Sequence, residues 1–156
     1  MSIALAIVGM GSPPALGSPP ALGSPPAGAE AARVLNVSDE GRLRFIASYG
    51  SELIDEGAVV GTLPGRVRVH FIYDGNPVVS AQFTISGRGG SISGHAKATL
   101  NNPTSPEPSF RGAFSATGGS GRYAHIHGAG ELFGVFTRRG PNKFRLVVQT
   151  IGKLHY

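Results

Sequence analysis

Two histidines separated by a single residue, His125 and His127, have a spacing that could bind a metal ion. Residues two apart in an extended chain point to the same face, so both imidazoles could bind zinc or copper if a third ligand converged on them. His95 and Glu131 are the candidates for that ligand. The alternative, which we favour, is a surface turn whose histidines face water, so we expect no metal site.

Two neighbouring acids, Asp55 and Glu56, are the carboxylates that could suggest acid–base catalysis. Adjacent side chains of a strand point to opposite faces, so these two cannot form a paired catalytic site by themselves. We interpret them as part of a loop.

Two glycine clusters have the composition of phosphate-binding loops, Gly87-x-Gly89-Gly90 and Gly118-Gly119-x-Gly121. Neither has the Lys-Ser/Thr pair or the strand-to-helix context of such loops, so hairpin turns explain them better. The serines stand in turns and on outward faces without a nucleophile elbow, and the chain has no cysteine. We therefore expect no cofactor and identify no catalytic nucleophile.

The elements that would position these residues are strands, because apolar and polar residues alternate over most of the chain. Val67, Val69 and Phe71 alternate with polar neighbours, and Asp74-Gly75-Asn76-Pro77 then predicts a hairpin turn. The predicted strands cover approximately residues 43–49, 58–63, 66–73, 80–86, 92–100, 110–116, 128–138 and 143–154.

About eight consecutive strands with short turns form an antiparallel meander, which is stabilised most simply by closing into a barrel that leaves no edge unpaired. A two-sheet sandwich is the alternative. The 24 glycines and 12 prolines among the 156 residues agree with many turns and count against long helices. The sequence thus predicts an all-β fold, a single antiparallel meander closed into a β-barrel over residues 32–156, preceded by a disordered segment rich in proline and glycine.

The inward faces of this barrel supply the candidate ligand-binding residues. Bulky side chains alternate there with small residues such as Gly94, Ala98 and Gly112, which leave room in a lumen that eight strands would otherwise fill. Tyrosine hydroxyls would be the polar groups inside it. The alternative is that the small residues only let the strands curl around a dry core. The candidate ligand-binding residues are Tyr49, Phe71, Tyr73, Phe83, Ala96 and Phe114.

The last strands carry apolar side chains on both faces, with Leu146 and Val148 on one and Val147 and Ile151 on the other. A second copy of the chain would be the simplest cover for the outer face, so we expect a homo-oligomer. An isolated exposed Val or Ile would need no such explanation.

The first 29 residues carry no charged side chain, and from Gly11 they repeat GSPPAL, GSPPAL, GSPPA. Such a repeat predicts a disordered linker. The apolar run over residues 1–10 and the small-x-small triplet Ala29-Glu30-Ala31 are typical of a signal peptide, although no Lys or Arg precedes the run. We therefore interpret residues 1–31 as a signal-like start and a linker, which predicts an extracellular or periplasmic protein. A mis-assigned start codon or an eroded signal is the alternative and would leave the protein in the cytoplasm.

Charge is distributed unevenly along the chain. Residues 30–64 hold six acids and three bases, whereas residues 65–156 hold three acids and eleven bases. A basic face for nucleic acid is one interpretation. We favour a solvated outer sheet face that the acidic first part neutralises in part, because the bases are spread one or two per strand without exposed aromatics between them. We expect no nucleic-acid partner and, since no stretch approaches about 18–20 apolar residues, no membrane span.

The stretch from Phe114 to Gly128 resembles the G-G-(S/T)-G-x-(F/Y)-x-x-x-x-G turn between late strands of the dirigent and allene oxide cyclase-like barrels. Glycines in such a turn permit positive φ where the chain reverses, and the aromatic residue inserts as a plug at the barrel end. The motif covers about fifteen residues, and a looser pattern of eight strands covers residues 34–156. The matching positions are Gly118, Gly119, Ser120, Gly121, Tyr123 and Gly128.

This resemblance implies an eight-stranded barrel that holds a small hydrophobic molecule in an apolar lumen, often within trimers or dimers. Some members cyclise or orient a reactive intermediate without a cofactor, so an enzymatic activity would be of the isomerase or cyclase type. The motif carries no catalytic residue that could be transferred to this chain. The alternatives are a non-catalytic secreted barrel that acts as a structural or partner-binding module, and a basic surface that binds an anionic polymer.

Overall fold

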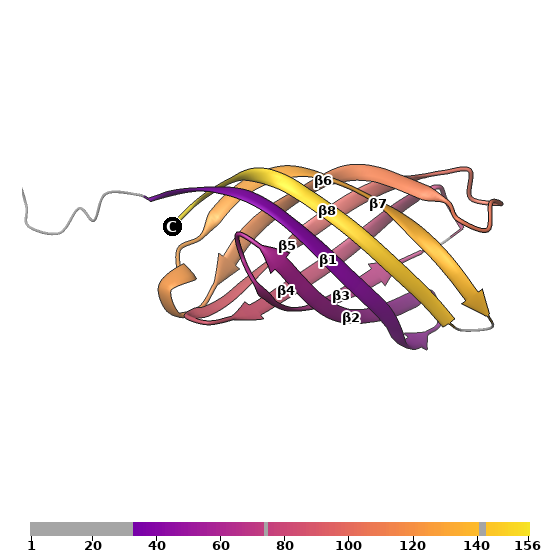
Figure 1. Ribbon diagram of the computed structural model, residues 1–156, viewed down its shortest axis with the longest axis horizontal. Helices are drawn as coiled ribbons and strands as arrows, with labels where there is room; N and C mark the ends of the chain where they lie inside the picture. The colour runs from indigo at the N-terminus through magenta and orange to yellow at the C-terminus, as the bar shows by residue number, and fades with distance from the viewer. Residues whose placement is uncertain (1–32, 74, 141–142) are drawn as a thin grey trace, which may run out of the picture. The chain divides into compact units, whose positions relative to one another are not determined.

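The computed structural model describes residues 33–73, 75–140 and 143–156 (Figure 1). The signal-like start and the linker predicted for residues 1–31 lie outside this range. Within it, no helix is long and apolar enough to cross a membrane.

Eight antiparallel strands follow one another along the chain and close into a barrel, which confirms the predicted all-β meander. Each strand pairs with the next, and β1 also pairs with β8, beside which it runs in Figure 1. The strands are β1 (Val34–Tyr49), β2 (Glu52–Gly61), β3 (Gly65–Ile72), β4 (Val78–Gly87), β5 (Gly90–Asn101), β6 (Ser109–Gly119), β7 (His127–Gly140) and β8 (Lys143–His155).

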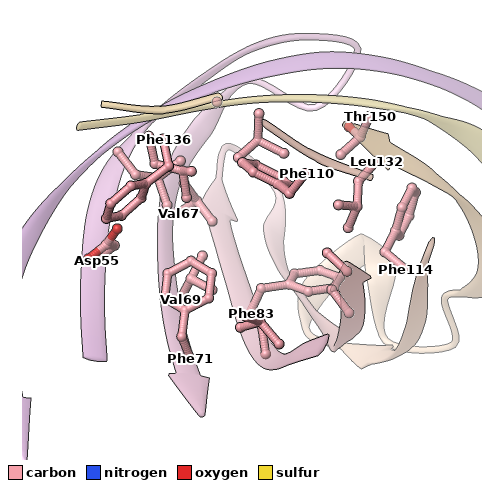
Figure 2. Close-up of a pocket in the computed structure, with 18 of the residues that line it drawn as sticks. Asp55, Val67, Val69, Phe71, Phe83, Phe110, Phe114, Leu132, Phe136 and Thr150 are labelled. Atoms are coloured by element: carbon pink, nitrogen blue, oxygen red, sulfur yellow. The ribbon is translucent and has the colours of Figure 1, made fainter. Parts of the chain in front are cut away.

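Alternation of side chains divides each strand between the lumen and the outer face. In β3, Val67 and Val69 point into the lumen, whereas Arg66 and Arg68 are exposed. Branched and aromatic residues of this kind pack well on a pleated, half-buried surface. Figure 2 shows inward side chains from several strands meeting in the lumen.

The two ends of the barrel differ because consecutive strands run in opposite directions. The β1–β2, β3–β4, β5–β6 and β7–β8 connections lie at one end, which we call the mouth. The β2–β3, β4–β5 and β6–β7 connections lie at the other, the closed end, together with the beginning of β1 and the end of β8.

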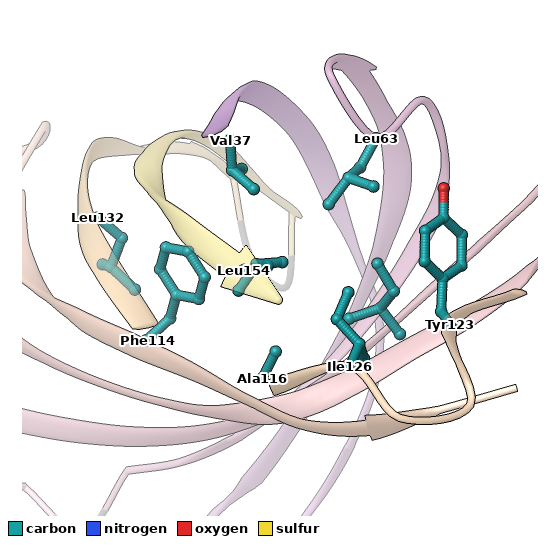
Figure 3. Packing of buried hydrophobic residues seen from close by; sticks show 9 residues of the cluster. Val37, Leu63, Phe114, Ala116, Tyr123, Ile126, Leu132 and Leu154 are labelled. Carbon is teal, nitrogen blue, oxygen red and sulfur yellow. The ribbon is translucent and has the colours of Figure 1, made fainter. Parts of the chain in front are cut away.

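A buried hydrophobic cluster fills the closed end (Figure 3). Leu63 comes from the β2–β3 connection, Leu154 from the end of β8, and Tyr123 and Ile126 from the β6–β7 connection. The Tyr123 ring also packs edge-on against Tyr156, with 5.6 Å between the ring centroids. These contacts place an aromatic plug at one barrel end, as the glycine-rich motif predicts.

The plug depends on the turn that precedes it. A short 3₁₀ helix, η1 (Gly121–Tyr123), begins at Gly121, whose φ is +61°. A Cβ on this residue would overlap the carbonyl oxygen of Gly89 in the neighbouring β4–β5 turn. Gly121 is therefore required both by its backbone conformation and by the close approach of the two turns.

Two expectations about element boundaries are wrong. The first strand begins at Val34, not at residue 43, and it continues through the polar stretch Ser38-Asp39-Glu40. Asp55 and Glu56 lie within β2 and not in a loop. In both places a carboxylate that faces inward interrupts the apolar alternation, so the local pattern does not resemble a strand.

Candidate functional site

The lumen contains a cavity of about 450 Å³, lined by inward side chains from all eight strands (Figure 2). Most of the lining is aliphatic or aromatic. Leu63, Leu154 and Ala116 border the cavity at the closed end, while the β5–β6 connection borders it at the mouth. The polar side chains among the lining residues are Asp39, Ser48, Asp55, Tyr73, Ser105, Arg138 and Thr150.

Five of the six candidate ligand-binding residues line this cavity. These five are Phe71, Tyr73, Phe83, Ala96 and Phe114. The sixth, Tyr49, is outside the lining, and 68% of its surface is exposed.

A β-bulge explains why Tyr49 faces outward. The register between β1 and β2 shifts between Phe45 and Ala47, so Ile46 is an extra residue on β1. One extra residue reverses the inward and outward positions that follow it. Ser48 therefore faces the cavity in place of Tyr49.

Three phenylalanines of the lumen each pair across the sheet with a glycine. Phe83 pairs with Gly94, Phe114 with Gly130 and Phe110 with Gly134. A Cβ on Gly94 would lie only 2.7 Å from the Phe83 ring, and a Cβ on Gly134 would overlap the Phe110 ring. The glycines thus let the rings lie against the barrel wall and leave the middle of the lumen open.

Asp55 is the nearer to the mouth of the two carboxylates that line the cavity. It is 4% exposed and lies between its cross-strand partners Phe45 on β1 and Val69 on β3. Burial raises the pKa of the Asp55 carboxyl to about 6, because the charged form loses its hydration. Its neighbour Glu56 faces outward, where it forms ion pairs with Arg66 and Arg68.

Asp39 is a second buried carboxylate, near the closed end. One of its oxygens, Oδ1, accepts a hydrogen bond from the Leu63 backbone N–H at 2.9 Å, and its other oxygen has no partner among the described residues. Burial raises the pKa of Asp39 despite that hydrogen bond. Along β1, Asp39 lies six positions before Phe45, the partner of Asp55, which corresponds to about 20 Å. The two aspartates therefore do not form a paired acid–base site.

The mouth is bordered by the β5–β6 connection and by the end of β7. The Phe136 N–H donates a hydrogen bond to the Pro108 carbonyl at 3.0 Å, and the Thr137 hydroxyl donates one to Glu107 at 3.3 Å. Pro103 and Pro106 of the connection also line the cavity. These contacts hold the connection beside the opening.

The histidines do not gather into a metal site in the described part of the chain. His125 and His127 are exposed, and the His127 ring stacks on His155 with 5.4 Å between centroids. Neither His95 nor Glu131 joins them, and the described residues contain no cluster of three or more potential ligands.

The outer face agrees with the interpretation of the basic residues as a solvated surface. Arg68 lies 3.3 Å from Glu56, and Arg111 lies 3.6 Å from Glu131. The acidic residue of β2 thus neutralises part of the charge on β3.

Comparison with protein-family models found no match, and no curated protein or solved structure matches the chain. The resemblance to dirigent and allene oxide cyclase-like barrels stays a prediction from the glycine-rich motif.

Proposed function

We propose that this barrel binds a small, largely apolar molecule in its lumen. The cavity of about 450 Å³ carries the proposal, because small-molecule sites have volumes of about 300–1,000 Å³ and mostly apolar walls. Strands that only curled around a dry core would fill their lumen with side chains. The cavity that Phe83, Phe110 and Phe114 line therefore supports a ligand-binding lumen and not a dry core.

The distribution of polarity supports an entry route through the mouth. The closed end holds the tightly packed cluster around Tyr123 and Ile126. The mouth instead has partly exposed lining residues, including Tyr73, 39% exposed, and the side chain of Arg138. A ligand would place its apolar body toward the closed end and any polar group nearer the opening.

Binding can be measured with the fluorescent dye N-phenyl-1-naphthylamine, which is uncharged near neutral pH. We expect wild-type protein to bind it and the Ala96→Phe variant to bind it at least ten-fold more weakly, since the added ring occupies the cavity. Ala98→Phe, on the same strand and in the same lining, serves as a second blocking variant. Ala58→Phe is the matched control, because Ala58 is exposed on the outer face of β2.

Circular dichroism and thermal unfolding establish that each variant is folded. Absence of dye binding and of binding by a panel of fatty acids and alcohols to the wild type would contradict the proposal and favour a structural or partner-binding barrel. Equal binding by the Ala96→Phe, Ala98→Phe and Ala58→Phe variants would place the dye outside the lumen. Cyclisation or coupling of a bound molecule stays a prediction from the resemblance, and export stays a prediction from the first residues.

A further inference from the structure

Asp55 lies next to a group of aromatic rings near the mouth. Its cross-strand partner Phe45 packs edge-on against Phe144 with 5.7 Å between centroids, and Phe144 packs against Phe136 at 4.9 Å. In the view of Figure 2, the Phe136 and Asp55 side chains project into the same part of the lumen. We call Asp55, Phe45, Phe136 and Phe144 the carboxylate–aromatic cluster.

The Asp55 carboxylate has no partner of its own in the described part of the chain. No group there donates a hydrogen bond to it or forms an ion pair with it, and burial is the single cause of its shifted pKa. An ionised carboxylate can only accept hydrogen bonds, and leaving it buried without a donor is unfavourable. A partner for this group has to come from what the cavity holds.

We propose that the ligand of this cavity is an apolar amine whose protonated nitrogen binds at the carboxylate–aromatic cluster, opposite Asp55. This inference rests on the proposed binding function and specifies the chemical class of the ligand. The ammonium group would form a charge-assisted hydrogen bond with the carboxylate, and the faces of the rings would attract the same positive charge.

The rings distinguish an amine from a neutral donor. A hydroxyl group would also donate a hydrogen bond to Asp55, but it would gain little from aromatic faces, whose attraction is for cations. The Arg138 guanidinium already lies 5.8 Å from the centre of the Phe144 ring, so Phe45 and Phe136 are the rings left for an incoming ammonium group. A carboxylate ligand held at the same place would be repelled by Asp55.

The position of Asp55 also sets the orientation of the ligand. Asp55 lies three residues inside β2 from the mouth, about 10 Å along the strand. An amine held there leaves the apolar body to extend toward Phe83, Phe110 and Phe114. The ligand class is therefore a primary amine with a flexible or flat apolar body, such as an alkylamine.

Competition between matched ligands tests this assignment. Decylamine, decan-1-ol and decanoate share one alkyl chain and differ in head group, and each can displace N-phenyl-1-naphthylamine from the full-length protein at pH 8. We expect decylamine to bind at least ten-fold more tightly than decan-1-ol, and decanoate to bind most weakly. In Asp55→Asn the advantage of the amine over the alcohol should be lost, while binding of the alcohol and the dye persists.

Two further variants distinguish the contribution of the carboxylate–aromatic cluster to amine binding from a general effect of charge. Glu56→Gln removes one negative charge from the neighbouring residue on the outer face and should leave the amine preference unchanged. Phe136→Leu removes a ring of the cluster. It should weaken the binding of decylamine more than the binding of decan-1-ol, so the preference for the amine falls. A preference that survives Asp55→Asn, or equal affinities for amine and alcohol in the wild type, would overturn the inference while the proposed function stands. Failure of every ligand and of the dye to bind would overturn both.

The pH provides a second readout. The groups that face Asp55 from β1, β3 and β7 are Phe45, Val69 and Phe136, none of which titrates, and the other titratable lining groups are Asp39, Tyr73 and Arg138. Protonation of Asp55 as the pH falls through about 6 should weaken decylamine binding and leave decan-1-ol binding almost unchanged. Amine binding that is equally tight at pH 5 and pH 8 would contradict the role of this carboxylate.

Discussion

Burial of the Asp55 side chain couples the stability of the barrel to its protonation. The folded protein holds the Asp55 proton more tightly than the unfolded chain does, because the pKa rises from 3.8 to about 6 on folding. When the folded state binds more protons, the free energy of unfolding falls as the pH rises between the two pKa values. Stability from this group is therefore greatest below about pH 4 and is lost by about pH 6.

The Asp55→Asn variant should not show this loss. A pKa change from 3.8 to about 6 corresponds to about 3 kcal/mol, so wild type should lose about that much stability, relative to the variant, between pH 3 and pH 7. Urea unfolding of both proteins across this range measures the difference, from which the contribution of Asp39, present in both, cancels. Glu56→Gln serves as the control for removal of an exposed carboxylate. Unfolding free energies that run parallel for wild type and Asp55→Asn would contradict the burial of an unpaired carboxyl.

Single residues account for what the sequence did not predict about the site. Alternation places Phe71, Phe83 and Phe114 in the lumen correctly because their strands are regular there. The positions of Tyr49 and Asp55 depend on non-local features, the bulge at Ile46 and the choice of a carboxylate for an inward position. No local sequence pattern indicates a bulge, and aspartate has a low strand propensity. The sequence therefore predicts a loop at Asp55, although its carboxylate lies in the lumen near the mouth.

At the scale of elements, the open space of the cavity depends on the cross-strand pairs of phenylalanine and glycine. A glycine at an inward position weakens an isolated strand, since it contributes no side chain to the core. Here each accommodates a ring from the neighbouring strand, as Gly134 does for Phe110. The strands themselves are predictable from alternation, but these pairs depend on the register between strands, which the sequence of one strand does not contain.

The turn at Gly121 allows an element-scale prediction. Replacement by Val should destabilise the barrel by about 1–3 kcal/mol, because a β-branched residue is strained at a φ of +61° and its Cβ would overlap the Gly89 carbonyl. Chemical unfolding measures the loss. Gly118→Val is the control in the same glycine cluster, since nothing lies within 4 Å of a Cβ at Gly118 and its φ is not in the left-handed region. An unchanged midpoint for Gly121→Val would contradict the turn geometry on which the Tyr123 plug depends.

At the scale of the whole molecule, the outer face of β7 and β8 carries an apolar patch formed by Phe133, Val135, Val147 and Ile151, which we call the β7–β8 outer patch. Val135 and Val147 are direct cross-strand partners. The exposed fractions of Phe133, Val135 and Ile151 are 39%, 41% and 47%. The residues around it carry both signs of charge, including the ion pair of Arg111 and Glu131. A face bordered by both signs can meet an identical face with opposite charges opposed, which favours a second copy of this chain over a partner of one charge.

We therefore predict that the protein self-associates through the β7–β8 outer patch. Sedimentation velocity or light scattering at increasing concentrations should give a mass that is a multiple of 16.1 kDa. Val135→Lys should shift the protein toward the monomer, because its cross-strand partners are Ser109 and Val147 and association would bury an unpaired charge in an apolar interface. Val78→Lys is the matched control, since Val78 is 41% exposed on the outer face of β4, on the far side of the barrel from the patch. A monomeric wild type at all concentrations, or equal dissociation in both variants, would contradict the prediction and leave the four side chains as ordinary exposed apolar residues.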